Sequence, residues 1–482
     1  MSRLLLVIPN TRWFDSPIWD IYPYNICLLA AVIKPYYKAD ILDCNVKDLS
    51  LDETLRQITE YDPEYVGITC MAVEYSRHAH LIADGIKKVL PEIKVILGGV
   101  YCTLMPDVAM QDLSIDYCVL GEGEVVLKKL LDCLEHKLPP KDLDGVAYRK
   151  DNSLIIKPQK EFIEDLDALP LPAFDQVDFS NYGYVNQKFS FTDTRDAVPV
   201  AKIYASRGCP VGCNFCAVEH IAGRKFRCRS VESVLDEIQF MISTYGVKEI
   251  VFYDDNLLFN RQRAKKMFQG IIDRKFNIKI KPANVAVYRL DKEMLELMKE
   301  ADCTLLVFAI ESSSNRVLHK IMGKPLSVET VPPIVEYAKR LGFRCAALFV
   351  IGNPGETWDE IRQTFSFAEH LDIYCHFSIA TPLPKTRLYK DASRHGYLTK
   401  DFSFAAGAGC SKGWLVTSEF SPFDLEVLRA YEWDRINFGT HEKKTRTAEF
   451  FKVSLAEVNE FARGARKALQ YRYVSEDFKR LP

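Results

Sequence analysis

The sequence predicts an α/β protein built from two parallel-sheet units and a helical C-terminal segment. Three observations predict this fold class. Short apolar strands alternate with helices over residues 1–140, a second set of strand–helix units runs from 198 to 400, and residues 401–482 are mostly helical in pattern. Buried strands that alternate with helices indicate parallel sheets whose faces are covered by helices.

The first unit, residues 1–140, has the pattern of a doubly wound, Rossmann-like domain. Its expected strands are "RLLLVIP", "KADILDC", "EYVGITC", "KVILGGV" and "IDYCVLGEGE". Ligands of such sheets bind beyond the carboxyl ends of the strands. The candidate binding residues at those ends are Pro9, Asn10, Thr69, Met71, Val73, Tyr75, Gly98, Gly99, Val100, Tyr101, Gly121, Glu122, Gly123 and Glu124.

Residues 141–197 are expected to form a linker or small adaptor with a hairpin at "DGVAYRKDNSLII". Strands at "VPVAKIYAS", "KEIVFYD", "KIKPANVAV", "TLLVFAIES", "RCAALFVIG" and "CHFSIATPLP" then define residues 198–400. Six strand–helix units predict a partial (β/α)6 barrel with its chemistry at the carboxyl ends of the strands. Residues 401–482 should add helices at 422–438, 443–452 and 454–471.

The overall composition is that of an ordinary globular protein. The 482-residue chain has a formal net charge of -2, with 48% hydrophobic and 27% charged residues. This balance gives no general basic field for nucleic acid, and no apolar run approaches a membrane span. Most of the 14 cysteines stand singly in apolar surroundings, as in a reducing compartment. We therefore expect a cytoplasmic protein with no membrane span and no nucleic-acid partner.

The exception among the cysteines is the stretch "RGCPVGCNFCA", directly after the first barrel strand. It places Cys209, Cys213 and Cys216 in a CxxxCxxC spacing. A closed zinc site needs a fourth ligand, for which His220 is a candidate. Structural zinc sites usually combine two-ligand knuckles, however, whereas three thiolates on one loop suit an iron–sulfur cluster with one open iron. The spacing therefore favours a cluster over zinc.

This motif, with Phe215 before its last cysteine, resembles the signature of the radical S-adenosylmethionine (SAM) superfamily. The resemblance implies that Cys209, Cys213 and Cys216 hold a [4Fe-4S] cluster whose fourth iron binds SAM. It also implies reductive cleavage of SAM to methionine and a 5′-deoxyadenosyl radical. Three later stretches resemble further motifs of the family: "FYDDN", "AIESSS" and "VIGNPGET". The glycines of "VIGNPGET" would allow the backbone to approach the adenine of SAM. In "TPLPKT", by contrast, Lys385 stands where many relatives have glycine. The implied SAM contacts are Phe215, Asp254, Asp255, Glu311, Ser312, Gly352, Asn353 and Pro354.

A radical SAM barrel behind a doubly wound domain resembles the cobalamin-binding radical SAM enzymes. The likeness covers most of residues 1–400, through "VGITC", "IKKVLPEIKVILGG", "DYCVLGEGE" and "LPLPAF". It implies that cobalamin binds at the strand ends of the first unit, where Gly98 and Gly99 allow a flat ligand to approach closely. The DxHxxG motif of methionine-synthase-like domains, whose histidine ligates cobalt, is missing, as in these relatives generally. The loop 69–75 should then cover the lower face of the cobalamin, and His78 and His80 should be surface or capping residues. The alternative is that the first unit no longer binds cobalamin.

By this resemblance, the first hypothesis is a cobalamin-dependent radical SAM methyltransferase. It would methylate an unactivated carbon of a small-molecule substrate and receive electrons from a donor such as flavodoxin or ferredoxin. The main alternative is an oxidative cyclase or ring-rearranging enzyme with the same cofactors. An RNA-modifying methylthiotransferase is disfavoured because its extra cluster cysteines and basic tail are missing, and a non-catalytic cobalamin or redox sensor because it needs no open iron.

Two features of the C-terminal segment leave the substrate open. Its frequent aromatic residues either line a pocket for a large apolar molecule or form core, and we favour core. Cys410 is either a hydrogen-atom donor or an incidental loop cysteine, which is the commoner case.

Overall fold

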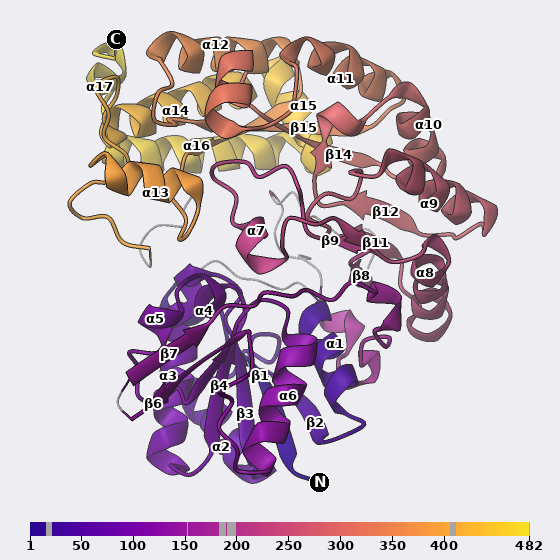
Figure 1. Ribbon diagram of the computed structural model, residues 1–482. Coiled ribbons are helices and arrows are strands. Elements are labelled where there is room, and N and C mark those ends of the chain that lie inside the picture. Colours follow the sequence, from indigo (N-terminus) through magenta and orange to yellow (C-terminus); the bar gives the residue numbers. More distant parts are fainter. Residues whose placement is uncertain (16–21, 152, 183–188, 190–198, 405–410, 482) are drawn as a thin grey trace.

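A computed structural model of the protein describes residues 1–482 except 16–21, 152, 183–188, 190–198, 405–410 and 482 (Figure 1). Cys410 therefore lies outside the described residues. Within the part that is described, none of the helices has the length and hydrophobicity that a membrane crossing requires.

The first part of the chain forms a seven-stranded sheet in the order β2-β1-β3-β4-β5-β6-β7. Its first five strands are parallel, as the alternating pattern predicts. The strands are β1 (Arg3–Ile8), β2 (Lys38–Asp43), β3 (Tyr65–Thr69), β4 (Lys94–Gly98), β5 (Tyr117–Val119), β6 (Val146–Lys150) and β7 (Ser153–Lys157). Their helices are α1 (Tyr24–Ile33), α2 (Leu51–Tyr61), α3 (Ser76–Val89), α4 (Val100–Leu104), α5 (Pro106–Ala109) and α6 (Gly123–Glu135).

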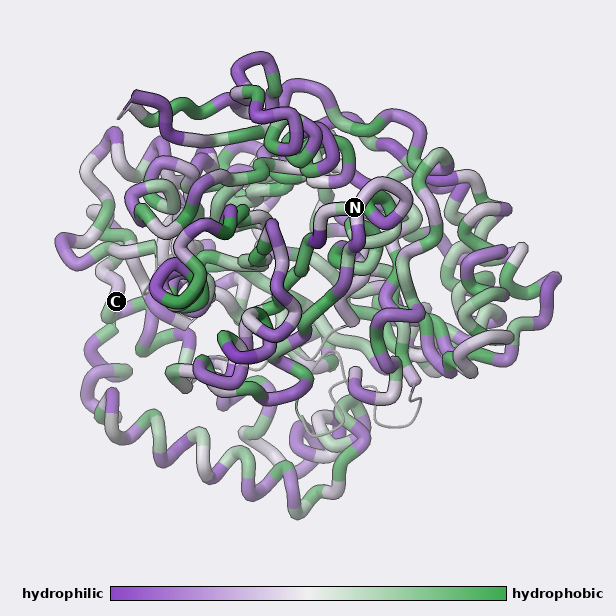
Figure 2. The backbone as a smooth tube through the Cα atoms, turned by 90° about the horizontal axis from the view of Figure 1, so that it is seen from below, coloured by the Kyte–Doolittle hydropathy of each residue, from purple (hydrophilic) through white to green (hydrophobic). Residues whose placement is uncertain are grey.

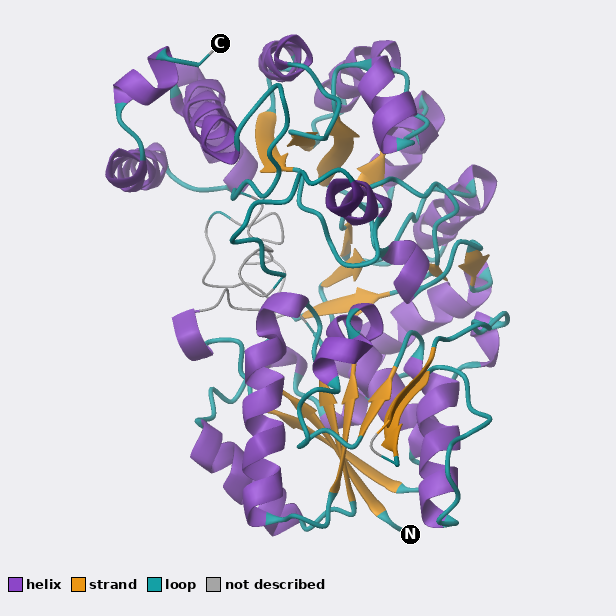
Figure 3. Ribbon diagram, turned by 60° about the vertical axis from the view of Figure 1, so that its left-hand side comes forward, coloured by secondary structure: helices purple, strands orange, loops and turns teal. Residues whose placement is uncertain are grey.

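Both faces of this sheet are covered by helices (Figure 3). Leu5 and Val7 of β1 pack into one core with α2 and α3, whereas Leu4 and Leu6 pack into another with α1 and α6. Successive residues of a strand point to opposite faces, so a strand buried on both sides needs an uninterrupted apolar run such as "LLLVI".

The hairpin expected in the linker is present as β6 and β7, but it belongs to the first sheet. Cys118 of β5 is aligned antiparallel with Ala147 of β6, and β7 completes the edge. The boundary expected at residue 140 therefore falls inside a sheet that ends at Lys157.

The next part is an open barrel made of two parallel sheets, in the orders β12-β11-β8 and β13-β14-β15-β16. The single strand expected at "KIKPANVAV" is split between them after Pro282, which has no backbone N–H for a ladder. An isolated bridge between Ile280 and Cys303 links the two sheets. The strands are β8 (Val200–Ile203), β11 (Glu249–Phe252), β12 (Lys279–Pro282), β13 (Val285–Ala286), β14 (Leu305–Glu311), β15 (Arg344–Ile351) and β16 (Tyr374–Ile379), and the short β9 (Ser206–Arg207) and β10 (Arg227–Cys228) pair outside them.

Helices on the outside of the barrel bury the largest core of the molecule. Figure 2 shows hydrophobic and hydrophilic residues intermixed along the coiled parts of the chain, as amphipathic packing requires. The outer helices are α8 (Val231–Tyr245), α9 (Arg261–Asp273), α10 (Lys292–Glu300), α11 (Val331–Arg340) and α12 (Trp358–His370). Two shorter helices lie outside this core, α7 (Val218–Ile221) between β9 and β10 and α13 (Arg387–Arg394) after β16.

The last helices are α14 (Pro422–Phe438), α15 (His441–Phe451), α16 (Leu455–Arg472) and α17 (Ser475–Lys479). Helix α14 runs along β16, from Leu425 beside Gly352 to Asn437 beside Cys375, and α15 lies at the amino-terminal ends of β14 and β16. Phe438, Phe450 and Phe451 pack against Leu305 and Tyr374, which confirms the core reading for these aromatics.

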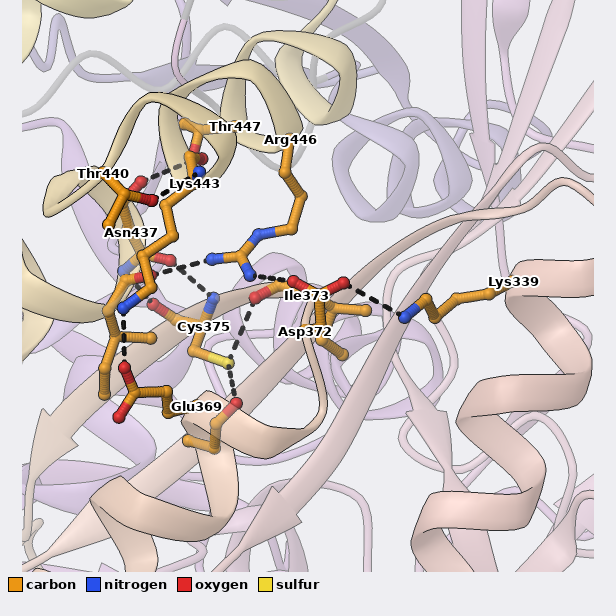
Figure 4. Close-up of polar contacts among 12 residues, drawn as sticks. Lys339, Glu369, Asp372, Ile373, Cys375, Asn437, Thr440, Lys443, Arg446 and Thr447 are labelled. Atoms are coloured by element: carbon orange, nitrogen blue, oxygen red, sulfur yellow. Dashed lines mark hydrogen bonds and ion pairs between the residues drawn. The ribbon is translucent and has the colours of Figure 1, made fainter.

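Polar contacts fix α14 and α15 to the barrel (Figure 4). The Asn437 side chain accepts a hydrogen bond from the Cys375 backbone at 3.0 Å and donates one to its carbonyl at 2.9 Å. Lys443 contacts Glu369 at 2.6 Å and, with Arg435, lowers the pKa of that carboxyl to about 2. These two helices are thus joined to the barrel.

Candidate active site

The three clustered cysteines lie on the loop between β9 and α7, beyond the carboxyl end of β8. Gly208 has a φ of +80°, and a Cβ there would lie 2.3 Å from the Lys225 carbonyl oxygen, so only glycine fits. All three cysteines are partly exposed. Burial raises the pKa of Cys213 to about 11 and that of Cys216 to about 12, so these groups are thiols until a metal displaces their protons.

Polar residues after β11 position this loop. Asp254 accepts hydrogen bonds from the Ala205 backbone and the Ser206 hydroxyl, and the Asp255 Oδ2 atom accepts one from Gly208 N at 2.8 Å. Burial raises the pKa of Asp254 to about 6 and raises that of Asp255 as well. Asp254 is therefore engaged with the protein itself, whereas the contacts of Asp255 involve only one of its oxygens.

Asn256, the third polar residue of "FYDDN", was missed by the sequence reasoning. Its Nδ2 atom lies 3.7 Å from Cys209 Sγ and 3.1 Å from the Tyr288 hydroxyl. An amide that donates to a cysteine sulfur is one of the protein's means of setting the potential of a cluster. The signal was available, because the motif ends in a polar residue at a strand end.

Glu311 ends β14 with a φ of +75° and is paired with Lys324, another residue that the sequence reasoning missed. Their charged atoms are 2.9 Å apart, and the side chains are 10% and 7% exposed. Burial lowers the pKa of Lys324, but Glu311 and the nearby Cys213 outweigh that effect and raise it overall. Ser312 is fully buried and accepts a hydrogen bond from Ser314 N, so its contacts lie within the protein.

The "VIGNPGET" segment lies beside the cysteine loop. The backbone N–H groups of Gly352 and Asn353 donate to Glu356 Oε2 at 2.8 and 3.0 Å, and burial raises the pKa of Glu356 to about 8. Asn353 contacts Asn214 of the cysteine loop at 3.4 Å, and Pro354 is partly exposed. Within the described residues, Asn214 Oδ1, Asn353 Nδ2 and Glu356 Oε1 are buried and have no hydrogen-bond partner.

Gly352 directly follows β15 and lies beside a side chain of the C-terminal helices. A Cβ at this position would lie 2.5 Å from Leu425 Cδ1. The φ of +81° at Gly352 is the physical reason for glycine. The expected approach of adenine to its backbone stays a prediction. Phe215 is partly buried and packs against the barrel core.

At the strand ends of the first sheet, some of the expected binding residues are accessible to a ligand and others contact the rest of the protein. Nothing lies within 4 Å of a Cβ built at Gly98, whereas one at Gly99 would lie 2.5 Å from the Cys70 carbonyl oxygen. The side of Gly98 on which a Cβ would stand is therefore open, whereas that side of Gly99 is filled by the Cys70 backbone. The partly exposed neighbours of Gly98 are Thr69, Met71 and Val100.

The other expected contacts at these strand ends are directed into the protein. Val73, Tyr75 and Tyr101 belong to the core between the sheet and α3, and Pro9 is buried. Asn10 donates to Asp48, and Gly121 and Gly123 face the side chains of Gln159 and Leu29. We expected His78 and His80 to be surface or capping residues. His78 is buried, with its Nε2 atom at the Trp13 carbonyl, whereas His80 is partly exposed and contacts Asp112 and Tyr101.

Glu122 and Glu124 join the two parts of the molecule. Arg227 donates to both oxygens of Glu122 at 3.0 and 2.8 Å, and Arg207 lies 2.6 Å from Glu124 and 3.3 Å from Glu122. These two carboxylates are therefore engaged by arginines of the barrel, where we had expected contacts to cobalamin. Since Arg207 stands two residues before Cys209, the ion-pair cluster fixes the cysteine loop against the first sheet.

A second contact joins the same edges. The Lys385 ammonium donates to the Thr103 carbonyl of α4 at 2.6 Å, while the Lys385 carbonyl is 3.1 Å from His220 Nε2. Helix α4 thus lies next to α7 (Figure 1). His220 is directed to this contact. Among the described residues no three His, Cys, Asp or Glu side chains, those of Cys209, Cys213 and Cys216 included, are arranged to hold a single metal ion. The preference for a cluster over zinc therefore rests on the spacing of the cysteines.

Comparison with known proteins identifies both parts. Residues 203–368 match the radical SAM superfamily, and residues 19–131 match the B12 binding domain. In solved structures, the fold is similar to that of the radical S-adenosylmethionine methyltransferase TsrM from Kitasatospora setae, with a TM-score of 0.71, 17% identity, and coverage of 97% of this chain and 100% of the other.

Sequence relatives extend over nearly the whole chain. An uncharacterized methyltransferase of Pyrococcus horikoshii is 31% identical over 405 residues, which are 83% of this chain and 84% of the relative. A cytidylyl-2-hydroxyethylphosphonate methyltransferase of Streptomyces wedmorensis is 27% identical over 450 residues, with the same two coverages. The chain belongs to the cobalamin-dependent radical SAM methyltransferase family.

Proposed function

We propose that this enzyme transfers a methyl group from SAM to an unactivated carbon of a small-molecule substrate, using a [4Fe-4S] cluster and cobalamin. The observation that carries the proposal is the position of the cysteine loop, which faces the open strand ends of the B12 binding domain across the Arg207–Glu124 and Lys385–Thr103 contacts. In our proposal a donor such as flavodoxin or ferredoxin supplies electrons, and the enzyme works in the cytoplasm.

The residues present fit these cofactors. Three thiols on one loop suit a cluster that keeps one iron open to SAM. The unpartnered polar atoms of Asn214, Asn353 and Glu356 beside that loop are available to a polar ligand. The open side of Gly98 leaves its backbone accessible to a ligand at the strand ends of the first sheet.

When bound, the cluster, SAM and cobalamin supply the electron, the radical precursor and the methyl carrier of the reaction. The chain's own residues bind and orient them. Cys209, Cys213 and Cys216 lose their thiol protons on ligation, and Asn256 donates to the sulfur of Cys209. We propose Asp255, Glu311 and Asn353 as contacts of SAM, because they follow β11, β14 and β15 at the carboxyl ends of the barrel strands.

The second role of the chain is to hold the two cofactor sites at a fixed separation. A reaction that needs a radical and a methyl donor at one substrate atom depends on their relative placement. The buried carboxylates of Glu122 and Glu124 and the guanidinium groups of Arg207 and Arg227 supply this rigidity.

SAM with a trideuterated methyl group tests methyl transfer. The reconstituted, reduced enzyme would be incubated with the small-molecule fraction of cells that carry its gene, and products would be identified by mass spectrometry. We expect a product that gains the deuterated methyl group, with one 5′-deoxyadenosine and one S-adenosylhomocysteine formed per product. Deoxyadenosine with an unlabelled new product would instead support the cyclase or ring-rearranging alternative.

A further inference from the structure

Lys202 lies in the middle of β8 on the inner face of the barrel. Its neighbours Ala201 and Ile203 pack into the core under α8 and α9, so alternation along the strand directs Lys202 to the opposite face. Part of its surface remains exposed to solvent. The proposed function has no role for this amine.

Aromatic rings surround the Lys202 ammonium. Its Nζ atom is 5.0 Å from the ring centroid of Tyr204 and 4.5 Å from that of Tyr253. In the described part of the chain no carboxylate forms an ion pair with it, and burial alone lowers the pKa of Lys202 to about 7. A cation–π contact restores only part of the hydration that a buried ammonium loses, so an apolar side chain would stabilise this position better.

A second amine lies on the same face. Val251 of β11 is aligned with both Lys202 of β8 and Lys281 of β12, so the three residues stand abreast. Lys281 is 4% exposed. Glu249 lies on the same face of this sheet, two residues nearer the amino-terminal end of β11, and is aligned with Val200 and Lys279. The middle layer of the barrel therefore carries two amines.

We propose that Lys202 binds an anionic group, a phosphate, phosphonate or carboxylate, of the substrate inside the barrel. The inference rests on the proposed function, which places the substrate in the barrel. Such a group compensates the charge of an amine for which no carboxylate among the described residues forms an ion pair. The anionic group belongs to the substrate and not to SAM. Lys202 lies about 7 Å along the strand from Tyr204, towards the amino-terminal end of the barrel, whereas the proposed SAM contacts lie at the carboxyl ends of the strands.

Competitive reductive methylation of lysine amines at about pH 7 tests this site. The labelling needs neither cofactors nor a reduced cluster, so its outcome is independent of the radical chemistry. A lysine with a pKa near the working pH holds far more neutral amine than an ordinary lysine and is labelled faster. We expect inorganic phosphate, methylphosphonate or acetate to slow labelling of Lys202 by at least about fivefold relative to chloride at equal ionic strength. Labelling of the exposed Lys129 should not change.

The thermal unfolding midpoint of matched variants completes the test. The same anions should raise the midpoint of the wild-type protein by about 2–4 °C. Lys202→Met should lose this rise, Lys202→Arg should retain it, and Lys129→Met should behave as the wild type. Equal labelling rates in all anions, or an unchanged rise in Lys202→Met, would overturn the proposal.

Discussion

We expect the Cys213→Ala variant to lose the iron–sulfur cluster and all measurable cleavage of SAM. Cys213 supplies one of three thiols on a loop whose backbone is held by a hydrogen bond from Asn214 N to the Met322 carbonyl at 2.8 Å. A cluster with two protein ligands is not retained, and production of 5′-deoxyadenosine should fall by more than about a thousandfold. Iron content, visible absorption and chromatography of deoxyadenosine measure these losses.

Cys228→Ala is the matched control. Cys228 is also a partly exposed free cysteine, and on β10 it is aligned with Ser206, just before the cysteine loop. This variant should keep the cluster and the cleavage of SAM within about twofold of the wild type. If Cys213→Ala kept its cluster, or if both variants lost it equally, the ligand assignment would be wrong.

The Glu122→Gln variant should be strongly destabilised. Glu122 is the carboxylate that Arg227 contacts through both terminal guanidinium nitrogens, Nη1 and Nη2. The side chain of Glu122 is 5% exposed and that of Arg227 is 2% exposed. Glutamine keeps the shape but removes the charge, which leaves Arg227 buried without its counter-charge. We expect a loss of about 3–5 kcal/mol in the free energy of unfolding, measured by urea denaturation.

The exposed pair of Arg56 and Glu60 provides the comparison. Both side chains are 61% exposed, so Glu60→Gln should change the free energy of unfolding by less than about 1 kcal/mol. We also expect Glu122→Gln to slow deoxyadenosine formation, because Arg207 holds the cysteine loop against Glu122 and Glu124. A loss no larger than that of Glu60→Gln would show that the ion-pair cluster does not join the two parts.

Local sequence patterns predicted most of the fold. The apolar run of β1 indicated a strand buried on both faces, and "RGCPVGCNFCA" was expected at the end of the first barrel strand, where the structure places it. The patterns could not predict which strand the hairpin pairs with. The hairpin of β6 and β7 reads as a separate adaptor, because its pairing with β5 depends on contacts between strands and not on its own composition.

The same limit applies to the candidate site. Glu122 and Glu124 stand at a strand end, where ligands bind, but their partners Arg207 and Arg227 lie 83 and 105 residues away in the sequence. Gly352 and Gly99 were expected to admit a ligand, and the structure adds that both have a positive φ and lie beside Leu425 and Cys70, which the sequence could not show. A glycine or a carboxylate in a motif shows its role only when its neighbours in space are known.

Anaerobic reconstitution, followed by measurement of bound iron, sulfide and cobalamin, tests the central claim most directly. The claim is that one chain holds a [4Fe-4S] cluster on its cysteine loop and cobalamin at the facing edge of the first sheet. We predict about four irons, about four sulfides and about one cobalamin per chain, and 5′-deoxyadenosine when SAM and a reductant are added. A reconstituted protein that binds neither cofactor, and that leaves SAM intact, would contradict the account.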